Sequence, residues 1–276
     1  MRILNLGAGV QSTTVYLMAN SGEIPAYDYA IFADTGEEPQ AVYRHLDWLL
    51  SLGGIPILIR SAGKLGEDLV RGRNSTGGRF AAIPAYVDHG PGRREGCGRR
   101  QCTREYKIDV IERTIRRELL GLKPRQRIPK GVTVMQAYGI SIDEAGRSRR
   151  IRERIRRHSP WIIPEFPLLD RLMSRADCIR WLQSRVPHEV PKSSCVFCPY
   201  KSNEQWRWLK DNDPEDWARA VEIDQALRNG AVAARGMKGR QFVHRSCVPL
   251  EEADLGSGSS PGQLSFALEC AGMCGV

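Results

Sequence analysis

A glycine turn followed by hydroxyl residues near the N-terminus has the composition of a phosphate-binding loop. Gly7 and Gly9 follow a short apolar run, and the Gln-Ser-Thr-Thr segment 11–14 opens a stretch typical of a helix. The first turn of a helix has N–H groups without intrahelical partners and the positive end of the helix dipole, so it attracts anions. Glycine lets the backbone approach an anion where a Cβ atom would collide. The alternative is a turn that only packs, because the Walker and dinucleotide-binding motifs are both absent.

A second polar segment follows the next expected strand. Residues 29–33 are apolar, as in a strand buried on both faces of a parallel sheet, and Asp34, Thr35 and Gly36 come next. Ligands of open α/β sheets bind outside the carboxyl ends of the strands. We therefore expect Asp34 to lie beside residues 7–12 and to take part in a site. The alternative role for Asp34 is a helix N-cap.

Two cysteines at Cys-x2-Cys spacing are the strongest metal-binding signal. Cys195 and Cys198 are followed by Pro199, and such a turn presents two thiolates to one metal. The same spacing occurs in redox dithiols. Cys102 stands at the start of an expected helix among basic residues, a setting that favours its thiolate. Cys178, in an apolar helix, is expected to pack in the core, and Cys247 is also expected to be structural.

The order of these motifs resembles that of a known family. Segment 6–13 is similar to the pyrophosphate (PP) loop, usually Ser-Gly-Gly-x-Asp-Ser-Thr, of the adenine nucleotide α-hydrolases, the PP-loop ATP pyrophosphatase superfamily. Segment 34–39 resembles the Asp-Thr-Gly-x-Glu motif of its phosphoadenosine-phosphosulfate (PAPS) reductase-like branch, and 102–107 resembles Cys-Thr-x-x-x-Lys. Segment 139–147 is similar to Gly-Ile-Arg-x-x-Glu-Ser-x-x-Arg. With the Pro-Leu-Leu tract 167–169, the resemblance reaches about residue 199 in the same order.

The loop departs from the family pattern at three positions. Gly7 replaces the usual first serine, Val10 a frequent lysine, and Gln11 the usual aspartate. Backbone N–H groups and Ser12 can still bind phosphate, but fewer charges remain to stabilise a leaving pyrophosphate or to orient Mg²⁺. The loop therefore favours nucleotide binding over rapid hydrolysis.

The resemblance implies an adenine-nucleotide site with an iron–sulfur cluster beside it. For ATP or a related nucleotide, with Mg²⁺ as a candidate further ligand, the implied residues are Gly7, Ala8, Gly9, Val10, Gln11, Ser12, Thr13, Asp34, Thr35, Gly36, Gly139 and Ile140. For a cluster, expected to be 4Fe-4S rather than zinc, the implied ligands are Cys102, Cys195 and Cys198, with Cys274 as the fourth and Cys97 or Cys270 as alternatives. The implied catalytic residues are Ser12, Asp34 and Cys270.

Other charged residues near these motifs have two possible roles each. Glu144 and Arg147 either pair with each other or face the nucleotide, and Lys107 either reaches phosphate or is solvated. His244 and Arg245 are weak candidates for contact with an anion.

The resemblance implies a PP-loop enzyme that adenylates an acceptor for sulfur transfer. An acceptor oxygen attacks the α-phosphate and releases pyrophosphate, and sulfur then displaces AMP. The expected partners are a sulfur donor or reductant protein and a nucleic acid, tRNA or DNA, as acceptor. One alternative is a sulfonucleotide reductase acting on adenosine phosphosulfate (APS) or PAPS, although the terminal His of its tail signature is absent. A second is a non-catalytic, zinc-stabilised module that binds nucleic acid.

Composition bounds these alternatives. The chain has 276 residues and a formal charge of +9, and roughly half of its 41 Lys and Arg residues lie between positions 93 and 157. Such a field attracts polyanions, although the same charges also suit a solvated face. The sequence has no apolar window of membrane-spanning length and no leader-like start, and its eight cysteines favour metal or redox chemistry over disulfides. We therefore expect a cytoplasmic protein without a membrane partner.

The alternation of expected strands and helices predicts an α/β protein with a doubly wound parallel sheet. The resemblance implies a mostly parallel, Rossmann-like (HUP-type) sheet with a helical, cysteine-bearing C-terminal part. Strands are expected near 2–6, 28–33, 55–60 and 132–139, and helices near 12–20, 39–52, 106–121, 173–185, 203–211 and 214–229. Residues 72–98 are expected to form a long loop, and Trp206, Trp208 and Trp217 a helix-pair core or interface. Residues 1–200 are expected to form the nucleotide-binding domain, with 201–276 as an extension packed on it.

Overall fold

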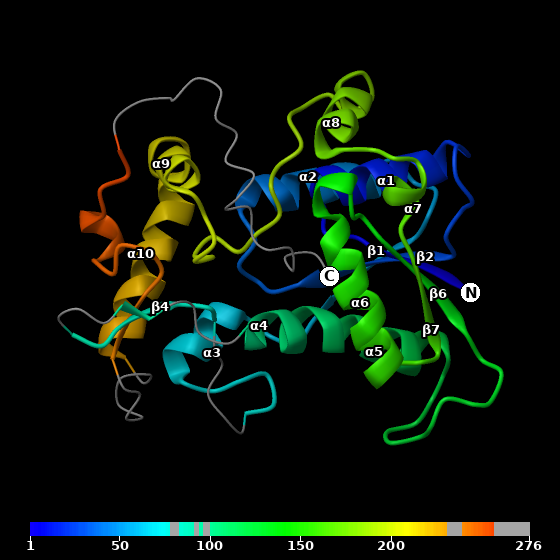
Figure 1. The fold of residues 1–276 in the computed structure, drawn as a ribbon, viewed down its shortest axis with the longest axis horizontal. Coiled ribbons are helices and arrows are strands. Elements are labelled where there is room, and N and C mark those ends of the chain that lie inside the picture. Colours follow the sequence, from blue (N-terminus) through cyan, green and yellow to red (C-terminus); the bar gives the residue numbers. More distant parts are fainter. Residues whose placement is uncertain (78–82, 91–93, 96–99, 231–238, 257–276) are drawn as a thin grey trace.

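The computed structural model describes residues 1–77, 83–90, 94–95, 100–230 and 239–256. Its centre is a parallel sheet of five strands in the order β3-β2-β1-β6-β7 (Figure 1). The strands are β1 (Arg2–Asn5), β2 (Tyr29–Asp34), β3 (Ile57–Ser61), β6 (Val134–Tyr138) and β7 (Ile162–Glu165). The strand order reverses between β1 and β6, which is where open α/β sheets bind ligands. The predicted α/β class with a parallel, Rossmann-like sheet is confirmed.

The middle of the sheet is buried on both faces because successive side chains of a strand point in opposite directions. Ile3 and Leu4 of β1 have no exposed surface. Leu4 packs in a cluster with Val15, whereas Ile3 packs in a separate cluster with Val110 and Ile111. The apolar runs read from the sequence are therefore strands covered by helices on each side.

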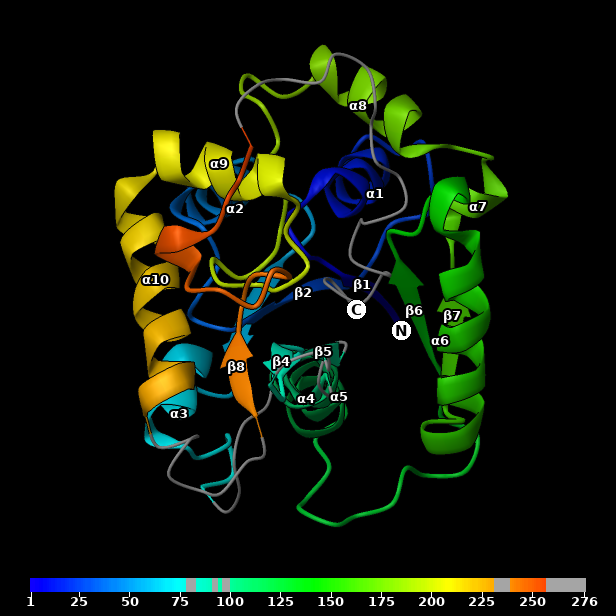
Figure 2. The ribbon, with the colours of Figure 1, turned by 60° about the vertical axis from the view of Figure 1, so that its left-hand side comes forward.

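The helices form a layer on each face of the sheet (Figures 1 and 2). One layer contains α1 (Val10–Asn20) and α2 (Gln40–Ser51), and α8 (Arg175–Gln183) packs against α1. The other layer contains α5 (Asp109–Thr114) and α6 (Ala145–His158), while the short α7 (Pro167–Asp170) follows β7. The helical segment that includes α5 begins with α4 (Gln101–Thr103) and continues through the π-helical turns η1 (Arg104–Ile108) and η2 (Ile115–Leu119).

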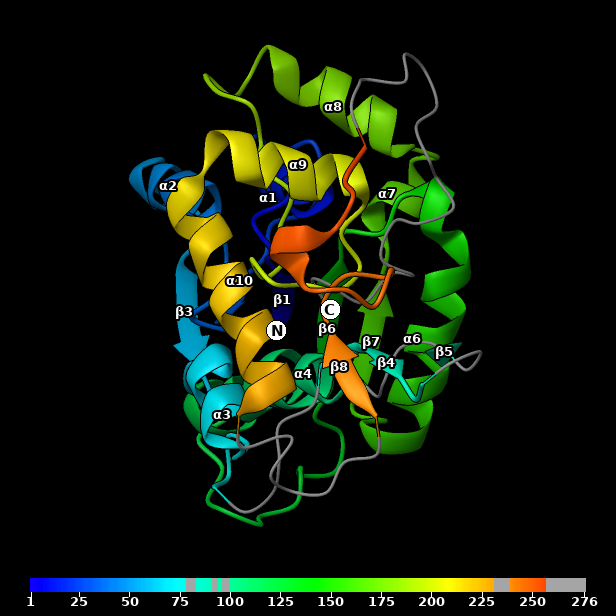
Figure 3. The same ribbon diagram turned by 90° about the vertical axis from the view of Figure 1, so that its left-hand side faces the viewer.

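A smaller antiparallel sheet and three helices lie beside the main sheet (Figure 3). Its strands, in the order β5-β4-β8, are β4 (Tyr86–Asp88), β5 (Arg94–Glu95) and β8 (Arg240–Phe242). The neighbouring helices are α3 (Leu65–Arg71), α9 (Asn203–Asn212) and α10 (Pro214–Asn229), and 3-10 turns lie at Ile142–Glu144 and Leu250–Glu252. Because β8 pairs with β4, residues beyond 200 complete a sheet begun before residue 100.

Two local predictions differ from the structure, and one helix was not predicted. The expected loop 72–98 contains both β4 and β5, and β4 pairs with β8, which lies far away in the chain. The arginine-rich stretch after Glu144 is helix α6, which buries only Arg147, Ile151 and Ile155. Trp206 and Trp217 make an edge-to-face contact as expected, but Trp208 lies on the exposed face of α9.

Among the described residues, no helix is both long enough and apolar enough to cross a membrane.

Candidate nucleotide and thiol site

The glycine turn is held together by the side chain of Ser12. Its Oγ accepts hydrogen bonds from the backbone N–H groups of Gly7 at 3.1 Å and Gly9 at 3.3 Å, and donates to the Gly9 carbonyl. Ala8, between the two glycines, adopts a positive φ of 53°. This arrangement makes Ser12 the residue that fixes the loop shape, while the first turn of α1 begins directly after Gly9.

The end of β6 and a cysteine-bearing segment both approach this loop closely. A Cβ atom on Gly139 would lie 2.8 Å from the backbone nitrogen of Ser12, so only glycine fits there. A Cβ atom on Gly9 would lie 3.4 Å from the nitrogen of Ser193, two residues before Cys195. The structure thus brings residues 7–12, 139 and 193 together at the carboxyl edge of the sheet, as the resemblance implied for the first two.

Asp34 lies at the end of β2 and is held in a fixed orientation. Its Oδ1 accepts hydrogen bonds from the Gly36 N–H and the Tyr43 hydroxyl, both at 2.8 Å. Asp34 is not the N-cap of α2, because that helix begins at Gln40 after Pro39. Burial and the neighbouring Asp34 carboxylate raise the pKa of Tyr43, so Tyr43 stays a hydrogen-bond donor. The sequence offered no signal for Tyr43, since a helical tyrosine is ordinary.

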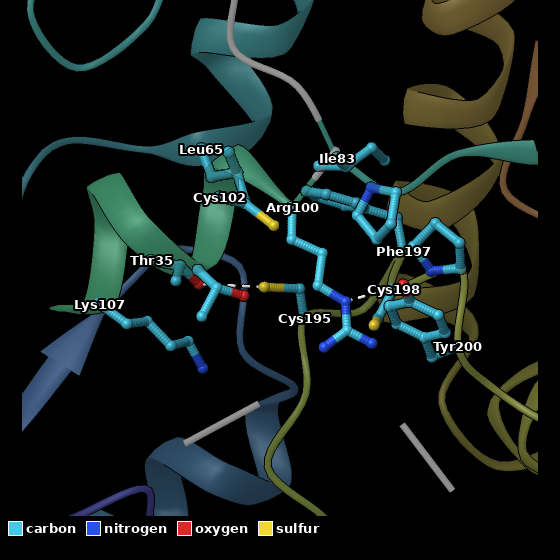
Figure 4. A pocket seen from close by; sticks show the side chains of 13 residues that line it. Thr35, Leu65, Ile83, Arg100, Cys102, Lys107, Cys195, Phe197, Cys198 and Tyr200 are labelled. Carbon is cyan, nitrogen blue, oxygen red and sulfur yellow. Dashed lines mark hydrogen bonds between the residues drawn. The ribbon is translucent and has the colours of Figure 1, made fainter. Parts of the chain in front are cut away.

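Three predicted ligand cysteines line one pocket beside Asp34 and its neighbours (Figure 4). Cys102 comes from α4, whereas Cys195 and Cys198 belong to a turn closed by a hydrogen bond from the Cys198 N–H to the Cys195 carbonyl. The cavity volume is about 40 Å³, within a hollow of about 490 Å³ that includes open solvent. Its lining consists of Thr35, Leu65, Ile83, Pro84, Arg100, Cys102, Thr103, Lys107, Cys195, Phe197, Cys198, Pro199 and Tyr200.

The three cysteines of this pocket are partly buried. Burial raises the pKa of Cys102, which a hydrogen bond from Thr103 and the positive charge of Lys107 partly oppose. Burial, with the negative charge of Glu38, also raises the pKa of Cys195, whose Sγ lies 3.3 Å from the Oγ1 of Thr35. A metal would have to displace these thiol protons. Within the described ranges, no three His, Cys, Asp or Glu side chains stand close enough together to hold a metal ion.

A buried ion pair connects the pocket with the segment over the glycine loop. Lys107 Nζ lies 2.9 Å from Glu38 Oε1, and the side chain of Glu38 is completely buried. The second carboxylate oxygen of Glu38 accepts a hydrogen bond from Ser193 at 3.2 Å. Lys107 is therefore not solvated. Its ammonium group is held by a carboxylate that lies 69 residues away in the sequence.

Gln11, which replaces the usual aspartate of the PP loop, belongs to a polar network at the other side of the loop. Its amide donates to Glu144 at 3.3 Å and accepts from Arg175 at 3.1 Å. Glu144 and Arg147 form an ion pair of 2.7 Å, and the Nε of Arg147 is buried without a hydrogen-bond partner. The pairing of Glu144 with Arg147 is thus observed, while the role of Arg175 was not apparent from sequence.

The remaining cysteines divide into two groups. Cys178 and Cys247 are buried, and Cys178 packs in the core cluster between α1 and α8, as expected. Cys97, Cys270 and Cys274 lie outside the described residues. His244 is buried in a hydrogen-bond network with Ser246 and Asn203, whereas Arg245 is exposed.

Comparison of the chain with protein-family models, curated proteins and solved structures finds no match.

Proposed function

We propose that this protein is a PP-loop enzyme of the PAPS reductase-like kind, which binds ATP or a related adenine nucleotide and adenylates an acceptor for sulfur transfer. The observation that carries this proposal is the shared wall between two predicted sites. Thr35 follows β2 in the predicted nucleotide segment, and its hydroxyl contacts Cys195 in the thiol pocket. A nucleotide activated at the sheet edge would therefore lie next to sulfur.

In this proposal the phosphates bind at residues 7–13, against the N–H groups and positive dipole end of α1. Ser12 keeps the loop in shape through its bonds to Gly7 and Gly9. Gly139 leaves room for the backbone of the loop, and Asp34 orients the adenosine or a metal ion from the end of β2. Thr13, Gly36 and Ile140 complete the residues proposed to surround the nucleotide.

Cysteine thiolates are the usual ligands of an iron–sulfur cluster, and three cysteines share the lining of this pocket. Among the described residues the three thiols do not stand close enough together to hold a metal ion, so a cluster would have to draw them together. The positive charges of Lys107 and Arg100 oppose the rise in the pKa of Cys102 that burial causes, and so favour the thiolate that iron requires. Cys102, Cys195 and Cys198 would hold the cluster, with Cys274 as the proposed fourth ligand and Cys97 or Cys270 as alternatives. When bound, a 4Fe-4S cluster can bind sulfur at one of its irons or can carry electrons. Zinc would use the same thiolates but would supply neither electrons nor colour.

The proposed reaction has three balanced steps. An oxygen of the acceptor attacks the α-phosphorus of ATP, the bond to the β-phosphate oxygen breaks, and pyrophosphate leaves with its electron pair. The terminal sulfur of a persulfide on a donor protein then attacks the adenylated carbon of the acceptor, and AMP leaves as the carbon–oxygen bond breaks. A reductant thiol cleaves the remaining disulfide, which frees the thiolated acceptor and leaves the donor joined to the reductant in a disulfide. The chain's own contribution is to bind the phosphates, exclude water from the thiol pocket and hold the acceptor beside the nucleotide.

Sulfonucleotide reduction is the second candidate, and Gln11 is the observation that favours it. The amide of Gln11 is committed to Glu144 and Arg175, so this position offers no carboxylate to orient Mg²⁺ on a leaving pyrophosphate. A sulfonucleotide reductase does not release pyrophosphate and needs no such group. In that reaction the thiolate of Cys270 would attack the sulfur of APS or PAPS, and AMP or its 3′-phosphate would leave as the sulfur–oxygen bond breaks. A reductant thiol would then attack Cys270 and release sulfite from the S-sulfocysteine.

The experiment supplies ATP, APS or PAPS to protein purified without oxygen and measures nucleotide binding, pyrophosphate and sulfite. Gly139→Ala should abolish binding because its Cβ would collide with Ser12, whereas Gly146→Ala, which meets no atom within 4 Å, should bind normally. Ser12→Ala provides a second loop variant, and circular dichroism checks the fold of each. Pyrophosphate without sulfite supports adenylation, and sulfite alone supports reduction. Wild-type levels of binding in folded Gly139→Ala and Ser12→Ala proteins would overturn the proposed site.

A further inference from the structure

Helix α6 carries an unusual density of positive charge on its solvent side. It has seven arginines and one glutamate among its 14 residues. Arg147 and Arg154 are turned toward the protein, where they pair with Glu144 and Glu112. The other five are exposed, namely Arg149, Arg150, Arg152, Arg156 and Arg157. Arg157 pairs with Glu153 on the helix itself.

The exposed arginines follow the axis of the helix. Arg149, Arg152 and Arg156 are spaced three and four residues apart, which places them on one stripe about 10 Å long. The helix lies at the outer flank of the main sheet beside β7 (Figure 2). It begins next to Glu144, whose carboxylate contacts Gln11 of the glycine loop. Charge therefore extends from the rim of the proposed nucleotide site along roughly 21 Å of helix.

A basic loop continues this charge at the far end of α6. Segment 121–131 contains four exposed basic residues and no acidic residue, namely Lys123, Arg125, Arg127 and Lys130. Its position is fixed by bonds from Arg116 to the Gln126 carbonyl at 2.7 Å and from Arg117 to the Leu122 carbonyl at 2.9 Å. The loop then enters β6, where the Val134 N–H donates to Trp161, just beyond the end of α6.

We infer that the outer face of α6 and the loop 121–131 form one surface that binds the phosphate backbone of a nucleic acid. Phosphates are closely spaced along a nucleic acid, and each arginine fork can donate two hydrogen bonds to one of them. The spacing of the arginines along a straight helix suits such a repeating anion. Neutralising several phosphates also releases counterions, which makes the binding strongly dependent on salt.

The composition of α6 favours a nucleic acid over a membrane or an acidic protein. A helix that binds a membrane surface presents apolar residues beneath its basic face, but Ile151 and Ile155 are buried in the core of this protein. The described part of α6 exposes no large apolar side chain that could anchor a protein partner. What the face offers is charge and hydrogen-bond donors, which is the composition of a backbone-binding surface.

The surface would also orient a nucleic-acid acceptor toward the proposed site. A nucleic acid along α6 would reach the Gln11–Glu144 contact at the start of the helix, so one of its nucleotides would lie at the rim of the proposed site. That acceptor role rests on the proposed function, whereas binding to the surface does not.

Binding is measured by fluorescence anisotropy with labelled RNA and DNA duplexes of about 20 base pairs, between roughly 50 and 200 mM salt. The test variant combines Arg149→Gln, Arg152→Gln and Arg156→Gln. The control combines Lys64→Gln, Lys210→Gln and Arg44→Gln, which remove the same charge from exposed positions on other elements. We expect the test variant to bind at least about tenfold more weakly and to lower the salt slope by about 2 to 3, while the control stays within about threefold of wild type.

Three outcomes would overturn the surface. They are no duplex binding by the wild type at low salt, equal weakening of the test and control variants, or equally tight binding to phosphatidylserine vesicles or polyglutamate. The duplex that binds more tightly, RNA or DNA, identifies which nucleic acid the surface prefers. ATP binding is measured on the same variants, so loss of nucleic acid binding with intact ATP binding separates a failure of this surface from a failure of the proposed function.

Discussion

Cys195 Sγ lies 3.3 Å from Thr35 Oγ1, although 160 residues separate them in the sequence. Thr35 follows the last residue of β2, and Cys195 begins the Cys-x2-Cys turn. The carboxyl edge of the sheet and the thiol pocket are therefore in direct contact.

Removing a thiol from the pocket should remove bound iron. Cys102→Ser and Cys195→Ser should each lose most of the visible absorption and iron of anaerobically purified protein, because three thiolates share the pocket. Cys178→Ala is the matched control, since Cys178 is buried in a different core cluster. Absorption spectra and metal analysis of the three variants give the answer. Stoichiometric zinc and no iron in the wild type would instead favour the zinc-stabilised module.

Breaking the buried pair between Lys107 and Glu38 should destabilise the fold. Lys107→Met leaves the Glu38 carboxylate buried with only Ser193 as a hydrogen-bond donor, at a cost of about 3–5 kcal/mol. Urea unfolding measures the loss. The double variant Lys107→Met with Glu38→Gln should recover part of the stability, because no uncompensated charge remains. Lys64→Met, at an exposed pair with Glu67, should cost less than about 1 kcal/mol; similar losses at both sites would disprove the importance of the buried pair.

Acidification should weaken the contact between α1 and α2 through His45. Burial, with the neighbouring His188, lowers the pKa of His45 to about 4 from its ordinary 6.5. The unfolded chain therefore binds more protons between these values, so the free energy of unfolding rises with pH. The contribution of His45 to the free energy of unfolding is complete above about pH 6.5 and is lost as the pH falls to about 4. It amounts to at most about 3 kcal/mol.

Urea unfolding between pH 4 and 7 compares the wild type with His45→Gln. In the wild type the Thr13 hydroxyl lies 2.9 Å from His45 Nε2, and the glutamine amide can still form a hydrogen bond with that hydroxyl. The variant should show a shallower pH dependence. His158→Gln, at an exposed position on α6, should leave the slope unchanged. Identical slopes for wild type and His45→Gln would refute the assignment.

Removing the hydrogen bond from Tyr43 to Asp34 should lower the affinity for nucleotide and should have only a small effect on the free energy of unfolding. Tyr43→Phe removes the hydrogen bond of 2.8 Å to Asp34 and should cost about 1–2 kcal/mol of stability. If Asp34 orients the nucleotide, affinity for ATP should fall several-fold in isothermal titration. Tyr16→Phe removes a comparable bond to the Ile55 carbonyl, so it should lower stability while leaving the affinity unchanged. Equal affinities of the two variants would show that Asp34 needs no such support.

Local features of the chain were predictable from its residues alone. The strands β1, β2, β3 and β6, the glycine turn and the helix starting near Ser12 follow from apolar periodicity and from backbone conformations that only certain residues adopt. The close approach of Cys195 and Cys198 follows from their spacing in one turn. These properties depend on neighbours within a few residues, so tertiary packing did not alter them.

Tertiary structure alone decided which distant groups meet. Lys107 reads as a solvated lysine until the fold buries it against Glu38, and Gln11 reads as a lost aspartate until Glu144 and Arg175 close around it. The arginine run after Glu144 became a helix because Ile151 and Ile155 fill a core formed by other elements. Burial changes the cost of a charge and the pKa of a thiol, and burial is a property of the whole fold rather than of any segment.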